Sequence, residues 1–540
     1  VAAARAFAWR GKAYLPVVVR EPGESGYSNL HGAIFHLAET NGFEPWRAPL
    51  VGTWAVNRYA TFGRFGGVIL NPPALLTDEP EPSWALLAPS RASVLQTQID
   101  RITVEAPADN TALLPPTQAQ GLAYLPGALT TVFDGQRCFE AGFLARPVTG
   151  DPDDLANPSG LEVGTYLYLF EWEHFDAKGN RHTSAVSPVV TVAVEVESKE
   201  LTFTVLTETY TRRADASDTR SNAARLVVYR TQKDSTGPFY RMTTPTALAY
   251  DGSNELYTPL ANNAFVDVVT YVDNTDDTEL TALGYGFYTG NLAGAIPGAI
   301  QDPGPVPPSR FLLNHKQRLF GISGDDPKTI FFSRFFVAGE APAFPPVFAV
   351  YLSDTDEAAT ALAPLQDKVL VFTANRIYYL YGEGPDDSGG GQGFSEPTLF
   401  SEAVGCTEPR SVAVTPLGVV FQASTDGIYL VGGDLSPVRI SGPVEDYFRR
   451  ASVHSVHVDT ARGWVVWTVV ETAPDSSTRP ALLVFSYWTQ TWTRWLPDQD
   501  NAIGTAGGTL WLGKHVHAAQ YEALAPYGMI ACEELNRYRD

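Results

Sequence analysis

The sequence predicts an all-β fold, and three features of its composition point to it. Aromatic residues make up 12% of the 540 residues, only 18% are charged, and 46 glycines and 40 prolines are scattered between short apolar runs. Aromatic residues favour strands, whereas glycine and proline mark the turns between them. Because a single hydrophobic core stops growing at ~250–300 residues, we expect two or more domains.

Two segments in the C-terminal half share one plan, DKVLVFTANRIYYLYG (367–382) and GVVFQASTDGIYLVGG (418–433). In each, an apolar strand ending in Phe372 or Phe421 runs into a polar turn and then into an Ile-Tyr strand. A spacing of roughly 50 residues is typical of the four-stranded blades of a β-propeller. We therefore predict that residues 305–540 form the C-terminal part of a β-propeller.

The stretch VFSYWTQTWTRW (484–495) is the most aromatic part of this half. Strand alternation places Val484, Ser486 and Trp488 on one face, and Phe485 and Tyr487 on the other. Both faces of the strand are therefore largely apolar. Such a strand is expected between two neighbouring sheets. We predict packing between blades for the following aromatic residues: Phe372, Phe421, Trp467, Phe485, Trp488, Trp492 and Trp495. The alternative is that Trp488, Trp492 and Trp495 form an exposed platform for a glycan.

The middle of the chain has a different pattern. Residues 165–196 alternate between apolar and polar side chains and turn at 176–179, and further strands of about seven residues follow. Antiparallel strands with turns at intervals of roughly ten residues are typical of an immunoglobulin-like or fibronectin-like β-sandwich. We assign this sandwich to residues 160–290, inserted into a propeller whose N-terminal part is residues 1–150.

Charge and cysteine content exclude several classes of protein. The net charge of −22 repels a phosphate backbone, so sequence-specific nucleic-acid binding is not expected. Three cysteines far apart, Cys138, Cys406 and Cys532, provide no disulfide framework or metal pair, and Cys406 is expected to be a buried structural thiol. No apolar run is long enough to span a membrane, so we expect no membrane insertion.

The candidate chemical motifs are weak. GPDDSGGGQG (384–393) lacks the Lys and the helix of a phosphate-binding loop, and we interpret it as a flexible loop between blades. His515 and His517 lie two residues apart but have no evident third metal ligand. Asp354, Asp356 and Glu357 are the preferred calcium position if any ion binds, although they lack the spacing of a calcium loop. No catalytic signature of a glycosidase or other hydrolase is present, so we expect no enzyme activity, cofactor or metal.

Three segments carry a family resemblance: DGQRCFEAGFLARP (134–147), PPSRFLLNHKQRLFGI (307–322) and the stretch from Tyr381 to Val431. In these segments the chain resembles the tail nozzle, or tail tubular protein B, family of short-tailed bacteriophages. The resemblance implies a β-propeller with inserted domains that forms one subunit of a sixfold ring at the distal end of the virion tail.

The resemblance also implies partners: the tail adaptor ring on the portal side, tail fibres or spikes, and genomic DNA that passes through without specific binding. An acidic channel wall would repel phosphate and let DNA slide. The candidates for that lining are Asp354, Asp356, Glu357, Asp386 and Asp387. The alternative function is a receptor-binding or glycan-binding tail propeller.

Overall fold

The computed structural model describes residues 117–495, apart from short segments at 128–129, 135–137, 197–198, 209–212, 214–223, 245–259, 263–267, 293, 424–426, 449–450 and 473–477, together with the strands within residues 2–58 and 500–534. All sheets among these residues are antiparallel, which confirms the all-β class. The described helices are short: α2 (Asp277–Ala282), α3 (Glu445–Phe448) and the 3-10 turns η5 (Pro409–Ser411) and η6 (Gly442–Val444). None of the described helices is long and apolar enough to cross a bilayer.

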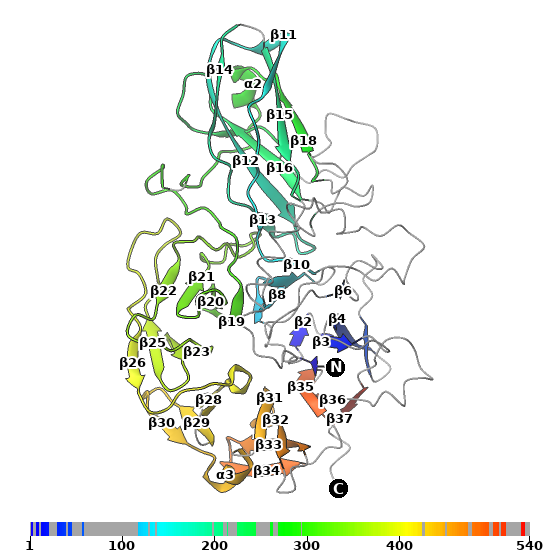
Figure 1. Cartoon of the computed structure of the whole chain (residues 1–540), viewed down its shortest axis with the longest axis vertical. Coiled ribbons are helices and arrows are strands. Elements are labelled where there is room, and N and C mark those ends of the chain that lie inside the picture. Colours follow the sequence, from blue (N-terminus) through cyan, green and yellow to red (C-terminus); the bar gives the residue numbers. More distant parts are fainter. Residues whose placement is uncertain are drawn as a thin grey trace.

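Five four-stranded sheets have the same topology, because in each of them the strands pair in the order in which the chain makes them. Figure 1 shows them following one another along an arc. The sheets are β7 (Thr117–Ala119), β8 (Leu122–Leu125), β9 (Thr131–Phe133), β10 (Cys138–Glu140); β19 (Ser309–His315), β20 (Arg318–Ser323), β21 (Thr329–Phe332), β22 (Ala349–Tyr351); β23 (Ala361–Leu365), β24 (Lys368–Phe372), β25 (Ile377–Tyr381), β26 (Thr398–Ser401); β27 (Ala413–Thr415), β28 (Gly418–Ala423), β29 (Gly427–Val431), β30 (Pro437–Arg439); and β31 (Ala451–Asp459), β32 (Trp464–Thr472), β33 (Thr478–Ser486), β34 (Thr491–Trp495).

Two further sheets come from the ends of the chain and lie side by side (Figure 1). Strand β35 contacts β31, β32 and the first three strands, and β37 contacts β5. The strands of these sheets are β1 (Ala2–Ala3), β2 (Phe7–Trp9), β3 (Lys12–Arg20), β4 (Leu30–Ala38), β5 (Gly42–Pro45), β6 (Asn57–Arg58), and β35 (Asp500–Ala506), β36 (Thr509–Lys514), β37 (Ala531–Glu534). We call these seven sheets together the sheet series.

The segment between β10 and β19 forms two more sheets, which we call the two-sheet module. One sheet has the order β11-β15-β18, and in the other β12 pairs with β13, β14 and β16, which in turn pairs with β17. The strands are β11 (Asp153–Leu161), β12 (Gly164–Phe175), β13 (Arg181–Thr183), β14 (Val190–Val194), β15 (Lys199–Leu206), β16 (Arg225–Arg230), β17 (Tyr240–Arg241) and β18 (Val268–Asp273). Their inner faces share one core in which the rings of Tyr168 and Phe203 lie 4.5 Å apart.

The second strand of a sheet is buried on both faces because it packs between neighbouring sheets. All six residues of β20 are buried, and one hydrophobic core joins the sheets that begin at β19, β23 and β27. A second core joins the β7–β10 sheet to the β19–β22 sheet, which precede and follow the two-sheet module in the sequence. There the hydroxyls of Thr130 and Ser309 are 2.7 Å apart, although 179 residues separate them in the sequence.

The same kind of contact fastens two of the sheets to the sheets that follow them. The turn after the first strand of one sheet reaches the loop after the third strand of the following sheet. Gln120 Nε2 donates to Val337 O at 3.1 Å, and Lys316 Nζ is 2.7 Å from Glu383 Oε1. Both turn residues have a positive φ, 51° and 48°, which is uncommon outside glycine and orients the turn in the same way each time.

Candidate functional site

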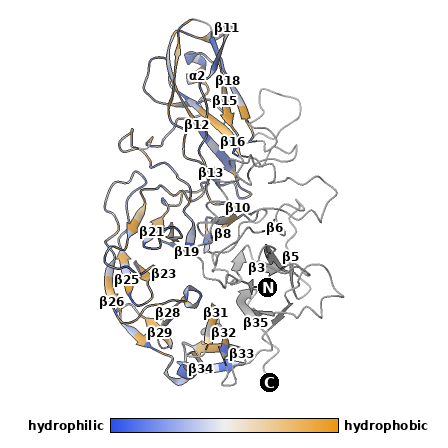
Figure 2. Cartoon of the chain, viewed as in Figure 1, coloured by the Kyte–Doolittle hydropathy of each residue, from blue (hydrophilic) through white to orange (hydrophobic). Residues whose placement is uncertain are grey.

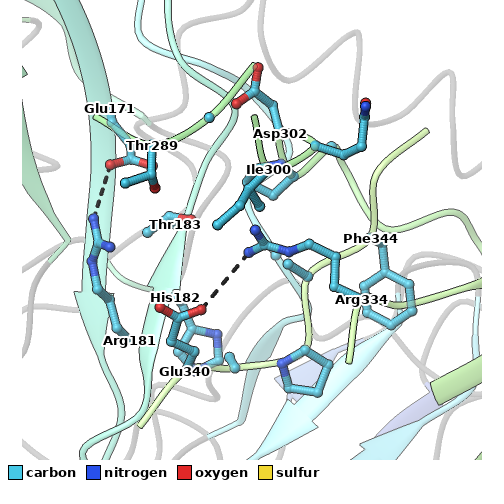
Figure 3. A pocket seen from close by; sticks show the side chains of 18 of the residues that line it. Glu171, Arg181, His182, Thr183, Thr289, Ile300, Asp302, Arg334, Glu340 and Phe344 are labelled. Carbon is cyan, nitrogen blue, oxygen red and sulfur yellow. Dashed lines mark hydrogen bonds and ion pairs between the residues drawn. The ribbon is translucent and has the colours of Figure 1, made fainter. Parts of the chain in front are cut away.

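A polar cavity of about 110 Å³ lies at the junction between the two-sheet module and the sheet series. Figure 3 shows Glu171, Arg181 and Thr183 on one side and Arg334 on the other, with Glu340 beside His182 at the bottom of the view. Residues 287–290 and 300–304, from the segment that leaves the module, form much of the remaining wall. Figure 2 shows the end of β12 and β13 that borders this cavity as hydrophilic, in contrast to the orange strands of the sheet cores. The junction is therefore more polar than the cores of the sheets.

Glu173 of β12 is the centre of a buried ion-pair network beside the cavity. Its carboxylate is fully buried and accepts hydrogen bonds from Arg225 Nε at 2.8 Å, from both terminal nitrogens of Arg241 at 2.9 Å and from Arg181 Nε. Burial alone would raise the pKa of Glu173, but the hydrogen bond from Arg241 and the positive charges of Arg181, Arg241 and Arg225 lower this pKa from 4.5 to about 2. The carboxylate is therefore charged at all physiological pH values.

Arg181 connects this network to the sheet series. Its guanidinium also lies 3.1 Å from Glu171, which accepts a hydrogen bond from the Tyr229 hydroxyl at 2.9 Å. Burial raises the pKa of Glu171. The backbone of Arg181 donates to Gly339 O at 2.8 Å and accepts from Ala341 N at 2.9 Å. Arg181 of β13 thus binds the loop between β21 and β22 through its backbone. Its side chain forms ion pairs with the carboxylates of the module.

A second buried cluster fastens the module to the β7–β10 sheet. Phe139 of β10 packs edge-on against the rings of His174 and His182, with centroids 5.3 Å away in each case. The Arg213 guanidinium carbon lies 4.6 Å from the centroid of the same phenyl ring, and its Nη1 is 2.6 Å from Glu140 Oε1. These aromatic and ionic contacts exclude water from the interface, which strengthens each of them.

The contacts in this region attach the two-sheet module to the sheet series. Around the cavity, carboxylates face arginines or tyrosine hydroxyls: Glu171 is bonded to Arg181, and Asp302 accepts a hydrogen bond from Tyr288. Arg334 and Glu340, the pair that Figure 3 joins by a dashed line, are 4.0 Å apart. Among the described residues, no group of three or more His, Cys, Asp or Glu side chains is placed to hold a metal ion.

The predicted aromatic residues lie mostly between sheets. Phe372 of β24 and Phe421 of β28 are fully buried in neighbouring sheets, with ring centroids 4.8 Å apart. Trp467 is fully buried and stacks on Trp492 at 5.5 Å, and Phe485 lies 5.0 Å from Trp492.

Trp492 and Trp495 are half-buried. Trp492 Nε1 donates to Ile440 O, beyond β30, at 2.9 Å, which ties the β31–β34 sheet to the sheet before it. The ring of Trp495 packs against that of Trp464 at 5.5 Å.

The prediction of interior packing is wrong for Trp488, whose exposed fraction is 64%. Strand β33 ends at Ser486, so Trp488 lies in the turn before β34, where strand alternation no longer applies. Its indole lies so close over Gly463 that a Cβ at that position would be 2.3 Å from it. The three-tryptophan platform considered as the alternative is therefore reduced to one exposed indole.

The first predicted acidic cluster is divided between two roles. Asp354 and Asp356 are exposed, and Asp356 Oδ1 is 3.2 Å from Lys328 Nζ. Both oxygens of Glu357 instead accept hydrogen bonds from the β24–β25 turn, from Asn375 N and Nδ2 at 3.0 Å and from Thr373 Oγ1 at 2.5 Å. Glu357 therefore stabilises the turn between β24 and β25 by hydrogen bonds.

The second acidic cluster lies in the glycine-rich loop, which is hydrogen-bonded both within itself and to neighbouring segments. Asp386 Oδ1 accepts from Ser388 Oγ at 2.6 Å and from Gly390 N at 2.9 Å, and these hydrogen bonds lower the pKa of Asp386. Asp387 O accepts from Gln301 N at 2.8 Å, and Asp387 Oδ1 accepts from Phe335 N at 3.1 Å. The loop thereby clamps the segment that leaves the two-sheet module.

Two further predictions concern potential ligands. Cys406 is buried as predicted, and burial raises the pKa of its thiol to about 12. His515 and His517 lie outside the described residues.

The sequence reasoning missed the junction residues because Glu171 and Glu173 alternate with aromatic residues, a pattern that ordinarily places charges in solvent. The signal that could have revealed them is the position of Arg225, directly opposite Glu173 on the neighbouring strand. Opposite charges at such paired positions favour a cross-strand ion pair.

Comparison with known proteins gives little guidance to function. No family model and no curated protein matches the chain. Among solved structures, PorZ, a surface component of the type-IX secretion system of Porphyromonas gingivalis, has 11% identity and a TM-score of 0.29 over 98% of this chain and 74% of PorZ. A Synechocystis ACO mutant has 9% identity and a TM-score of 0.23 over 73% of this chain and 81% of that one. AztD from Citrobacter koseri has 10% identity and a TM-score of 0.22, covering 65% and 89%. Likenesses at these scores support no argument about function.

Proposed function

We propose that this chain is a structural subunit of the tail nozzle of a short-tailed bacteriophage, located in the virion tail. The observation that carries the proposal is that the three segments resembling this family pack together. Ala141, from the first segment, shares a hydrophobic core with Leu312 and Leu319 from the second. Arg318, also from the second, donates to Pro385 O in the third. Segments far apart in the sequence thus form one continuous region of the structure.

In this proposal the seven sheets of the sheet series are the blades of a β-propeller, and the two-sheet module is an immunoglobulin-like insertion. The consecutive strand order of the five four-stranded sheets supports the first assignment, and the two packed antiparallel sheets support the second. The contact between the end sheets supports closure of the ring within one chain. A subunit of this kind needs no enzymatic activity and no cofactor.

The assembly in this proposal is a homo-oligomeric ring, a hexamer, that continues the DNA-exit channel. The net charge of −22 supports free passage of DNA, because an acidic wall repels phosphate. Exposed Asp354, Asp356 and Asp386 are the candidates for the channel wall, whereas Glu357 and Asp387 hold loops in place. The adaptor ring above and tail fibres or spikes at the periphery are the proposed partners.

The test is the mass of the purified chain in solution, alone and after mixing with the adaptor ring, by light scattering and electron microscopy. Rings, or monomers that assemble on the adaptor, are the expected result. A chain that stays monomeric with the adaptor and binds host glycan instead would favour the alternative, a receptor-binding propeller. Of the three tryptophans considered for that alternative, Trp488 is the exposed one.

A charge-reversal experiment tests the channel. A virion that carries Asp354→Lys, Asp356→Lys and Asp386→Lys together should assemble but release its DNA more slowly, because lysines attract phosphate. Glu279→Lys, an exposed substitution on helix α2 of the module, is the matched control. Equal ejection rates for both variants would contradict the assignment of these residues to the channel wall.

A further inference from the structure

An imidazole lies in the buried contact between the two-sheet module and the β7–β10 sheet. His182 of β13 is only 3% exposed, and its Nε2 is 3.0 Å from Asp176 Oδ2. Its ring packs on Phe139 of β10 and lies 5.8 Å from the ring of His174. Histidine is the side chain whose charge changes most readily near neutral pH. A titratable group is therefore part of the attachment surface.

The carboxylate beside this histidine accepts several other hydrogen bonds. Asp176 accepts from Lys178 N at 2.7 Å and from Asn180 N and Nδ2 at 3.0 Å, in addition to the imidazole. Three N–H donors besides the imidazole therefore stabilise the Asp176 carboxylate, whether or not His182 is protonated. Asp134 Oδ2, from the β7–β10 sheet, accepts from Ala177 N at 3.0 Å and completes the contact.

Charged groups face His182 from every side, and their effects oppose one another. Asp176 and Asp134 favour a proton on the ring, whereas Arg213 disfavours it. The Arg213 charge is itself paired with Glu140. The remaining titratable and charged groups near the ring or across the adjoining cavity are His174, Tyr124, Glu171, Arg181, Tyr229, Tyr288, Asp302, Arg334 and Glu340.

Burial is the largest effect, and it lowers the pKa of His182 below the usual 6.5 in spite of Asp176. If the contact opens, the imidazole meets water and regains its ordinary pKa. The proton then binds the open arrangement more readily than the closed one. By linkage, attachment is full above the ordinary pKa and weakens as the pH falls below it.

We propose that His182 makes the attachment of the two-sheet module to the sheet series reversible and dependent on pH, firm at neutral pH and loosened in a mildly acidic medium. The inference is independent of the proposed function, because it concerns only contacts within one chain. Loosening would release the module while the strands of both parts remain folded.

The experiment is hydrogen–deuterium exchange of the full chain between pH 7.5 and 5.0, corrected for the intrinsic effect of pH on exchange. The amides of Arg181 and Ala341 report attachment directly, since each donates across the junction. Their protection should fall relative to amides of β24 as the pH drops below about 6.5, by at most tenfold per pH unit for one proton. Protection should return when the pH is restored.

Three variants make the test specific. His182→Gln keeps a donor for Asp176 but does not titrate, so the fall in protection should disappear. His174→Gln should retain it, and so should Glu171→Gln, which removes a nearby carboxyl group whose pKa is raised by burial. Protection in the native chain that stays constant down to pH 5.0 overturns the proposal whether or not the variants fold. Persistence of the fall in His182→Gln also overturns it.

Discussion

Replacing Glu173 by Gln should destabilise the two-sheet module more than any surface substitution. Gln keeps the shape and one oxygen acceptor of the side chain but removes the charge that faces Arg181, Arg225 and Arg241. Removing one partner of a buried ion pair costs about 3–5 kcal/mol, because the remaining charge is left uncompensated. The lowering of the Glu173 pKa from 4.5 to about 2 gives a similar figure, about 3 kcal/mol.

The assay is amide exchange of strand β16, which pairs with β12 at Glu173. A loss of about 3 kcal/mol should accelerate exchange by ~100-fold or more. The matched control is Glu162→Gln. Glu162 lies 3.0 Å from Lys233, a similar distance, but the Glu162 side chain is 72% exposed and the pair is screened by water. Acceleration of less than about fivefold, or equal to that of the control, would refute the reasoning.

The pH dependence of the same interaction has a definite sign. Because the pKa of Glu173 is lowered on folding, its contribution to stability is fully present above the unfolded value of 4.5 and is lost as the pH falls through about 2. The glutamine variant should lose this acid-dependent part of the unfolding free energy. Urea titrations of both forms at pH 6 and pH 3 measure the difference.

Three further outcomes follow from packing. Trp467→Ala should cost about 3–5 kcal/mol in urea titration, because the ring is fully buried between sheets, whereas Trp488→Ala should change stability by less than about 0.5 kcal/mol. Cys406 should resist alkylation in the native chain and react after unfolding, as peptide mass mapping would show, since burial raises its thiol pKa to about 12. Gly463→Ala should destabilise by about 1–3 kcal/mol in the same titration, because its φ is 71° and a Cβ would meet the Trp488 indole.

Local patterns predicted the strands and some of their neighbours. The hairpins around Phe372 and Phe421 follow from apolar runs broken by polar turns, and their rings meet because both runs form the second strand of a sheet. The alternation argument failed at Trp488 because it assumed that the strand continued beyond Ser486. A strand's end depends on the turn, which the aromatic pattern does not describe.

The candidate site could not be predicted in the same way, since its residues are brought together by tertiary contacts. Arg181 meets Gly339 only because the chain returns to the sheet series after a long insertion. The glycines of residues 384–393 predicted a flexible loop. They do not reveal the hydrogen bonds that Asp386 and Asp387 accept from backbone N–H groups. Glycine content indicates how many conformations a loop can adopt, whereas the conformation that it adopts depends on its hydrogen-bond partners.

The chain leaves the sheet series and returns to it at nearly the same point. A Cβ on Gly142 would lie 3.1 Å from the Val306 side chain, and Ser309 hydrogen-bonds to Gly127 across the gap. Inserting or removing a unit between two such neighbouring points leaves the surrounding pairing unchanged. The same geometry would let evolution exchange the module for another appendage without rebuilding the sheet series, and it marks where an engineered fusion could be placed.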